Sequence, residues 1–189
     1  MLVGCEESGA VRDAFAAAGH DAMSADLQPS AGNHYQGDVF DLVGERFDLV
    51  VLHPPCTYLA KVSAPVLARD PDRRQLLTLG AEFFRRCLDW PAPMVAVENP
   101  HMLASAMRLI GRRPTQWVEP WQFGDPYTKH TGLWLRGLPP LVPDRVVAPV
   151  MGSWVTKRRD SVGRSKTFAG VARAMAEQWP GGGGAVELW

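Results

Sequence analysis

The sequence has 189 residues, of which 46% are hydrophobic and 21% are charged, as in soluble globular proteins. That length fits one domain with a real core, and the composition excludes a disordered chain. Twenty basic and twenty acidic residues cancel to a net charge of zero. The balance argues against a strongly basic nucleic-acid binder, although it is compatible with a local basic patch.

The cysteines and the hydropathy pattern exclude further classes. Cys5, Cys56 and Cys87 are sparse and odd in number, and no Cys-x-x-Cys pair is present, so we expect neither a disulfide framework nor a metal site. The first residues, MLVGCEESG, do not resemble a signal peptide, and no apolar run approaches the ~20 residues of a membrane helix. We therefore expect a chain of the reducing cytoplasm.

The first half of the chain alternates strand-like and helix-like segments. In chain order we predict a strand at 1–4, a helix at 10–18, a strand at 22–25, a loop at 28–36, a third strand end at 37–38 and a strand at 47–52. Ser8 is suited to cap the first helix, and Gly19 is suited to end it. The run FDLVVL at 47–52 is continuously apolar, as expected of a central parallel strand covered on both faces.

The second half begins with the same alternation and then changes. We predict a helix at 72–88, a buried strand at 94–97, strands at 116–119 and 133–135, a loop at 139–156, a basic stretch at 157–166 and a last helix at 169–179. One face of the 72–88 helix is expected to carry Leu76, Leu79, Phe83, Cys87 and Leu88. The alternation indicates an α/β fold with a mostly parallel sheet and an antiparallel C-terminal end. Residues 1–180 are expected to form a single catalytic domain, followed by a flexible tail at 181–189.

Ligands of open parallel sheets bind outside the carboxyl ends of the strands, and here those ends are polar. Gly4 and Gly9 flank a turn that lets backbone approach a ligand closely. Asp26 is suited to accept hydrogen bonds from two ribose hydroxyls, and Asp38 from an adenine amine. The set favours an adenosyl ligand, since the chain lacks the Gly-x-Gly-x-x-Gly of pyrophosphate sites and the Gly-Lys-Ser/Thr of triphosphate sites.

Two strand ends carry reactive groups. His53-Pro54-Pro55-Cys56 follows a buried strand, and its prolines make the loop rigid, so that the thiol is held at a set place. A thiol there is either a nucleophile or a cysteine packed behind a proline turn. Glu98 ends the adjacent strand, where it is either a cap, a rim carboxylate or the partner of Cys56. A cysteine and a glutamate together suit attack on carbon 6 of a pyrimidine, with the acid at ring nitrogen 3.

Over almost its whole length the sequence resembles the cytosine carbon-5 DNA methyltransferase superfamily, especially its short phage-type members. Pro55-Cys56 matches the loop of the nucleophile, and Glu98-Asn99 matches the activating acid, with Pro100 in place of the usual valine. The resemblance implies a Rossmann-like methyltransferase fold, S-adenosylmethionine as cofactor, and a cysteine adduct with cytosine in DNA. It implies that the protein is located in the cytosol of a bacterium or of the bacterial host of a phage. For site residues it implies Cys56 and Glu98 in catalysis, contacts to the cofactor from Gly4, Glu6, Ser8, Gly9, Asp26, Asp38, Pro54 and Thr167, and contacts to the base from Asn99, Lys129 and His130.

The sequence departs from that family in three places. The first glycine motif is replaced by Gly4-Cys5-Glu6-Glu7-Ser8-Gly9. The Gln-x-Arg-x-Arg segment is absent, and Lys129 or His130 stands where its arginine is expected. From the length we expect no large target-recognition domain. A base flipped out of a duplex, at a cost of a few kcal/mol, is then expected to be held by other contacts. One alternative is an exocyclic-amine DNA methyltransferase, since His53-Pro54-Pro55-Cys56-Thr57-Tyr58 also resembles the Asp/Asn/Ser-Pro-Pro-aromatic motif of such enzymes. The others are a cytidine-nucleotide carbon-5 methyltransferase and a non-catalytic DNA- or nucleotide-binding protein.

Overall fold

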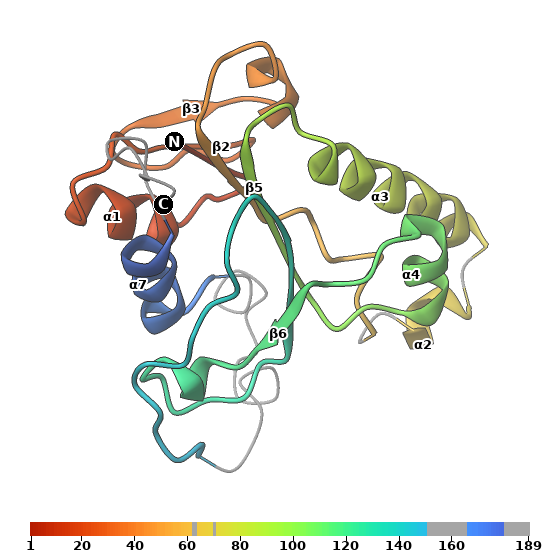
Figure 1. The fold of residues 1–189 in the computed structure, drawn as a ribbon. Helices are drawn as coiled ribbons and strands as arrows, with labels where there is room; N and C mark the ends of the chain where they lie inside the picture. Colours follow the sequence, from red (N-terminus) through yellow and green to blue (C-terminus); the bar gives the residue numbers. More distant parts are fainter. Residues whose placement is uncertain (62–63, 70, 151–165, 180–189) are drawn as a thin grey trace.

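The computed structural model describes residues 1–61, 64–69, 71–150 and 166–179 (Figure 1). Within these residues, seven strands form one sheet in the order β3-β2-β1-β4-β5-β7-β6. The strands are β1 (Leu2–Gly4), β2 (Met23–Asp26), β3 (His34–Gln36), β4 (Leu49–Leu52), β5 (Met94–Pro100), β6 (Gln116–Val118) and β7 (Thr131–Arg136). The five strands β1 to β5 pair in parallel, whereas β7 pairs antiparallel with both β5 and β6. This confirms the predicted mostly parallel sheet with an antiparallel C-terminal end.

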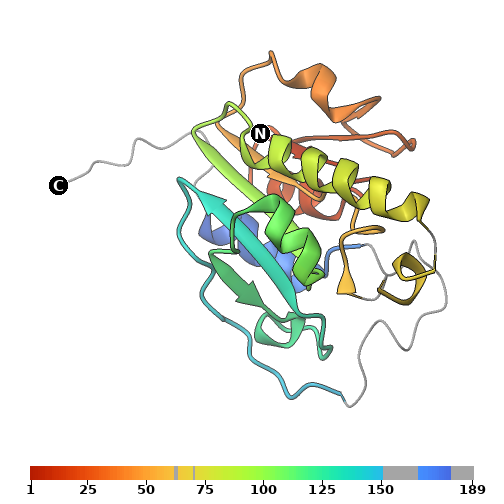
Figure 2. The ribbon, with the colours of Figure 1, turned by 90° about the vertical axis from the view of Figure 1, so that its right-hand side faces the viewer.

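Helices cover both faces of the sheet (Figures 1 and 2). The helices α1 (Ala10–Ala17) and α7 (Ala169–Gln178) pack together on one face, and α3 (Asp72–Leu88) and α4 (Ala104–Ile110) on the other. The strand β4 is buried at all four residues because both layers lie against it. Alternate residues of the central strands point into two separate apolar clusters, one beneath each helix layer. The remaining elements are short: α2 (Ala64–Leu67) and the 3-10 helices η1 (Val39–Leu42) and η3 (Pro120–Gln122).

Some sequence predictions need correction. The third strand occupies His34–Gln36, inside the segment expected as loop. In α3 the predicted Cys87 and Leu88 are buried and Phe83 packs against the core, whereas Leu79 is 51% exposed, and Ala81 and Phe84 are buried without having been predicted. The helices α2 and α4 were not predicted. The basic stretch lies outside the described residues except for Lys166, as does the tail at 181–189.

The order of the strands reverses between β1 and β4. The chain runs outward from β1 to β2 and β3, and then crosses back to β4 on the other side of β1. At such a switch point the loops after the two strands diverge and leave a crevice at their carboxyl ends. The loops after β1 and β4 are the ones that carry Glu6 to Gly9 and His53 to Cys56.

Candidate active site

Strand register places four polar residues in a row across the carboxyl edge of the sheet. Gly4 pairs with both Ala25 and Leu52, and Leu52 pairs with Val97. The residues that follow these positions are therefore neighbours: Asp26, Cys5, His53 and Glu98. Residues far apart in the sequence meet here because parallel strands end at a common edge.

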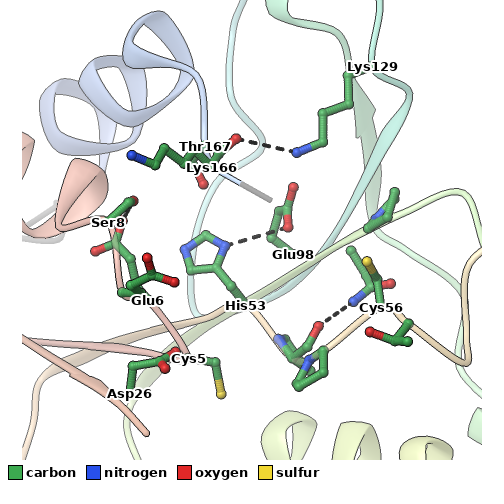
Figure 3. Close-up of a pocket in the computed structure, with 16 residues that line it drawn as sticks. Cys5, Glu6, Ser8, Asp26, His53, Cys56, Glu98, Lys129, Lys166 and Thr167 are labelled. Carbon is green, nitrogen blue, oxygen red and sulfur yellow. Dashed lines mark hydrogen bonds and ion pairs between the residues drawn. The ribbon is translucent and has the colours of Figure 1, made fainter. Parts of the chain in front are cut away.

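A pocket of about 280 Å³ opens over this row (Figure 3). Its wall is built from the loops after β1 and β4, the ends of β2 and β5, and the segments before β7 and α7. The lining residues are Cys5, Glu6, Glu7, Ser8, Asp26, His53, Pro54, Pro55, Cys56, Thr57, Glu98, Asn99, Pro100, Lys129, Lys166 and Thr167. The pocket thus brings together Cys56 and Glu98, and most of the residues expected to contact a cofactor or a base.

His53 and Glu98 form a buried pair at the centre of the pocket. His53 Nδ1 lies 3.5 Å from Glu98 Oε2, at the long end of a hydrogen bond, and the two side chains are 11% and 12% exposed. Burial raises the pKa of Glu98, but the hydrogen bond from His53 and the positive charge of Lys129 outweigh it and hold the pKa below its ordinary value. Glu98 is therefore ionised at neutral pH.

The other ring nitrogen of His53 is unsatisfied. Its Nε2 is buried and has no hydrogen-bond partner among the described residues. When the ring proton is on Nδ1 and directed to the Glu98 carboxylate, Nε2 can accept a hydrogen bond. Leaving a buried polar atom unpaired costs about 1–3 kcal/mol, so a ligand that donates a hydrogen bond to it gains affinity.

The loop that carries Cys56 is held from two sides. The Asn99 side-chain amide, which is buried, donates to the Pro54 carbonyl oxygen at 2.8 Å. The carbonyl oxygen of Cys56 accepts from the backbone of Leu59 and Ala60 at 3.0 and 2.9 Å, closing a turn directly after the thiol. Asn99 therefore positions the loop, and its own Oδ1 has no partner among the described residues. Cys56 is partly exposed and lines the pocket.

The two other cysteines are unsuited to act as nucleophiles. Cys5 has a left-handed backbone with φ of 58°, and its side chain packs against the apolar cluster under α3 and α4. Figure 3 shows its sulfur on the side away from the His53 ring. Burial, followed by the nearby carboxylates of Asp26 and Asp38, raises the pKa of Cys5 to about 12. Burial also raises the pKa of Cys87. Neither thiol ionises near neutral pH, and the thiolate is the nucleophilic form.

The turn between β1 and α1 combines a structural role with a place in the pocket. The Glu6 carboxylate accepts from the backbone of Val11 at 2.7 Å and of Arg12 at 3.2 Å, and Ser8 Oγ accepts from the backbone of Ala10 at 3.3 Å. These bonds satisfy the amides at the start of α1. Gly9, the N-cap, has a left-handed φ of 69°, as its small size allows.

Gly4 and Asp38 lie outside the pocket lining. A Cβ at Gly4 would come within 2.5 Å of side-chain atoms of both Leu52 and Val39, so close packing inside the protein requires this glycine. Asp38 starts η1, and its carboxylate accepts from the backbone of Phe40 at 2.9 Å. Gly9 is also absent from the lining, whereas Asp26 lines the pocket at the end of β2.

Of Lys129 and His130, both predicted to contact the base, only Lys129 lines the pocket. Lys129 Nζ donates to the Lys166 carbonyl oxygen at 3.5 Å and lies close enough to Glu98 to lower its pKa. His130 is absent from the lining and is exposed, and its Nδ1 lies 3.1 Å from Glu119 Oε1. The pocket lining therefore carries the carboxylates of Glu6, Glu7 and Asp26, from the ends of β1 and β2, together with the ammonium groups of Lys129 and Lys166.

His53 is the site residue whose role the sequence did not indicate. The sequence marked it as the first residue of the proline loop and of the alternative amine-methyltransferase motif, but not as a partner of Glu98. Its contact with Glu98 follows from the register of β4 against β5, in which Leu52 pairs with Val97. The usable signal was that both residues directly follow apolar runs predicted to be neighbouring parallel strands.

Comparison with known proteins gives a structural match. No family model and no curated protein matches the sequence. Among solved structures, the chain is similar to a prophage-encoded protein of E. coli described as a DNA modification methyltransferase. The match has a TM-score of 0.50 and 17% sequence identity, and covers 78% of this chain and 51% of that one. The chain thus spans about half the length of that structure. The likeness shows the fold alone, which is a Rossmann-like α/β fold.

The described residues contain neither a membrane-spanning helix nor a metal-binding cluster. None of the helices in these ranges is long and apolar enough to span a bilayer. Nowhere in the same ranges do three or more His, Cys, Asp or Glu side chains gather in a way that could hold a metal ion.

Proposed function

We propose that the protein is an S-adenosylmethionine-dependent methyltransferase that methylates carbon 5 of cytosine in DNA through a covalent adduct with Cys56. The observation that carries the proposal is that Cys56 and Glu98, from two different strand ends, line one pocket at the switch point of a Rossmann-like fold. The neighbour described as a DNA modification methyltransferase supports DNA as the substrate. Since the chain spans about half of that structure, the substrate belongs to the proposal.

The charges of the pocket fit the methyl donor. S-adenosylmethionine supplies a methyl group on a positively charged sulfonium sulfur, which is strongly electrophilic. The carboxylates of the lining suit that cation, and Asp26 lies at the end of β2, where its carboxylate is suited to accept from two ribose hydroxyls. Ser8 and Thr167 add hydroxyl groups to the lining of the pocket.

The first step uses Glu98 as a base and then as an acid. Ionised Glu98 takes the proton of the Cys56 thiol, and the thiolate forms a bond from Sγ to carbon 6 of the cytosine ring. Glu98 then donates that proton to ring nitrogen 3, so the charge of the adduct is neutralised. The electron pair of the former double bond becomes available at carbon 5, which accepts the methyl group.

The second step restores the enzyme. A base removes the proton from carbon 5, the bond between carbon 6 and Sγ breaks, and the ring double bond forms again. The proton at nitrogen 3 returns to Glu98 and from there to Cys56. The rigid proline loop and its bond to Asn99 keep the sulfur in place during both steps.

His53 sets the pH at which Glu98 can act. We expect His53→Ala to move the acid limb of the pH profile of kcat/KM to higher pH, because burial of Glu98 would raise its pKa without the bond that lowers it. Steady-state rates measured from pH 5 to 9 check this. Lys129→Met is expected to shift the limb in the same direction, since Lys129 also lowers the pKa of Glu98. An unmoved limb in His53→Ala would contradict the role.

A second candidate function is methylation of an exocyclic amine. The observation in its favour is the buried, unpartnered Nε2 of His53, which is suited to accept from an amine of cytosine or adenine at the position where related motifs carry Asp, Asn or Ser. This chemistry needs no thiol, so it leaves Cys56 without a role.

Product analysis tests the proposal. We expect incubation with labelled S-adenosylmethionine and duplex or single-stranded DNA to yield 5-methylcytosine, measured by mass spectrometry of the hydrolysed nucleosides. A free cytidine nucleotide incubated in parallel is expected to give no product. N4-methylcytosine or N6-methyladenine would establish the second candidate instead, and a product from the free nucleotide alone would replace DNA as the substrate. DNA binding without any product would indicate a non-catalytic protein.

A further inference from the structure

Three exposed rings form a cluster at the antiparallel end of the sheet. Trp117 of β6 and His130, which directly precedes β7, are stacked with centroids 4.3 Å apart and planes 9° from parallel. His101 meets both rings edge to face, at 5.6 Å from Trp117 and 5.7 Å from His130. All three residues are exposed, and Trp117 is 38% exposed. We call these three residues the ring cluster.

The ring cluster is held in place from below and from the side. Gly132 pairs with Trp117 across β6 and β7, and a Cβ at Gly132 would lie 3.2 Å from the Trp117 ring, so the glycine lets the indole lie close against the strand. The His130 ring is fixed by its 3.1 Å contact with Glu119, whose other oxygen accepts from the backbone of Lys129 at 2.7 Å. The rings are therefore ordered before any ligand arrives, which lowers the entropy lost on binding.

The ring cluster is continuous with the candidate active site. His101 follows Pro100, and His130 follows Lys129, and both preceding residues line the pocket. The backbone of Lys61 donates to the His101 carbonyl oxygen at 2.9 Å, which joins the cluster to the segment that begins at Cys56. Lys61 is exposed and adds a positive charge, while the Glu119 carboxylate is engaged by His130 and by the Lys129 backbone.

We propose that the ring cluster is a stacking platform for a base of the DNA strand that flanks the target cytosine. This inference rests on the proposed function, since it takes DNA as the substrate. Stacking on aromatic rings suits any base because every base has a flat π-face, and the positive charge of Lys61, whose backbone bonds to His101, complements the phosphates. The platform holds the strand next to the pocket while the target base lies inside it.

The test measures binding of a fluorescently labelled single-stranded oligonucleotide with one cytosine, by fluorescence anisotropy of the full chain. We expect Trp117→Ala to weaken binding by about 5- to 150-fold, the range that loss of one stacked base gives. Trp117→Phe keeps a ring and is expected to bind within about threefold of the wild type. Leu79→Ala, which removes an apolar side chain 51% exposed on α3, is the matched control and is expected to bind as the wild type does.

An abasic scan gives the second arm. The bases that flank the cytosine are removed one at a time. We expect one of these removals to weaken binding by the wild type and to leave the binding by Trp117→Ala unchanged. Three results would each overturn the inference. The first is equal binding of the intact oligonucleotide by Trp117→Ala and the wild type, and the second is weaker binding by Trp117→Ala than by the wild type at every abasic position. The third is a wild type that does not bind the oligonucleotide. The product analysis is independent of this result. If the product is 5-methylcytosine and Trp117→Ala binds as the wild type does, the stacking platform alone is wrong. If the product is N4-methylcytosine and Trp117→Ala binds more weakly, the carbon-5 chemistry alone is wrong.

Discussion

Replacing Cys56 by alanine is expected to abolish methyl transfer, with a loss of about 10⁴-fold or more in kcat, as when a covalent nucleophile is removed. Carbon 5 of cytosine is a weak nucleophile, and the proposed bond from Cys56 to carbon 6 is what makes its electron pair available. The other two cysteines cannot take over because burial keeps both thiols protonated. Initial rates with labelled donor and DNA measure the loss.

The covalent step itself can be trapped. With DNA carrying 5-fluorocytosine, the proton at carbon 5 is replaced by fluorine, so the adduct cannot be resolved after transfer and the protein is expected to stay bound to the DNA in a denaturing gel. Cys56→Ala is expected to form no such band. Cys5→Gly removes the other cysteine of the pocket at a position with positive φ that glycine accepts, and is expected to form the band. Full transfer by Cys56→Ala would refute the covalent route.

The parts of the fold that were predicted from the sequence are those set by local pattern. Residues 72–88 were predicted as a helix and form α3 over that span, and the apolar runs at 47–52 and 94–97 contain β4 and the start of β5. Cys87 and Leu88 of the predicted buried face of α3 are buried, but Leu79 is exposed, because Leu76 and Leu79 suit a helical stripe as well as Leu77 and Ala81 do. The neighbours of α3, Phe40 of η1 and Met107 of α4, decide which stripe is covered. Neither η1 nor α4 was predicted.

The candidate site shows the same division. Cys56 and Glu98 were singled out because each follows a buried strand, and both line the pocket. The contact between His53 and Glu98 depends on the register of two strands whose residues are 45 positions apart, and no local pattern gives that register. The ring cluster was missed for a similar reason. Trp117 and His130 stack only because β7 runs back antiparallel along β6. A single tryptophan in a short strand predicts a buried residue equally well.

Glu98→Gln is expected to lower kcat by about 10²- to 10⁴-fold, the usual contribution of a general acid or base. The glutamine is nearly isosteric, and its oxygen can still accept from His53 Nδ1, so the pocket keeps its shape. It cannot carry the Cys56 proton to ring nitrogen 3. Because Glu98 acts on the base in this mechanism, the dissociation constant for S-adenosylmethionine, measured by calorimetry, is expected to stay within about threefold of the wild type.

Asp26→Asn is the matched variant with the opposite expectation. An asparagine oxygen can still accept from the backbone of Gln28, as Asp26 does at 2.8 Å, so the turn after β2 is kept while the charge is lost. Weaker bonds to two ribose hydroxyls are expected to raise the dissociation constant for the donor by about tenfold or more, since hydrogen bonds to charged groups contribute about 1.5–3 kcal/mol. With saturating donor, kcat is expected to recover in Asp26→Asn and not in Glu98→Gln. If Glu98→Gln instead loses the donor, Glu98 belongs to the donor site and the proton relay through it is wrong.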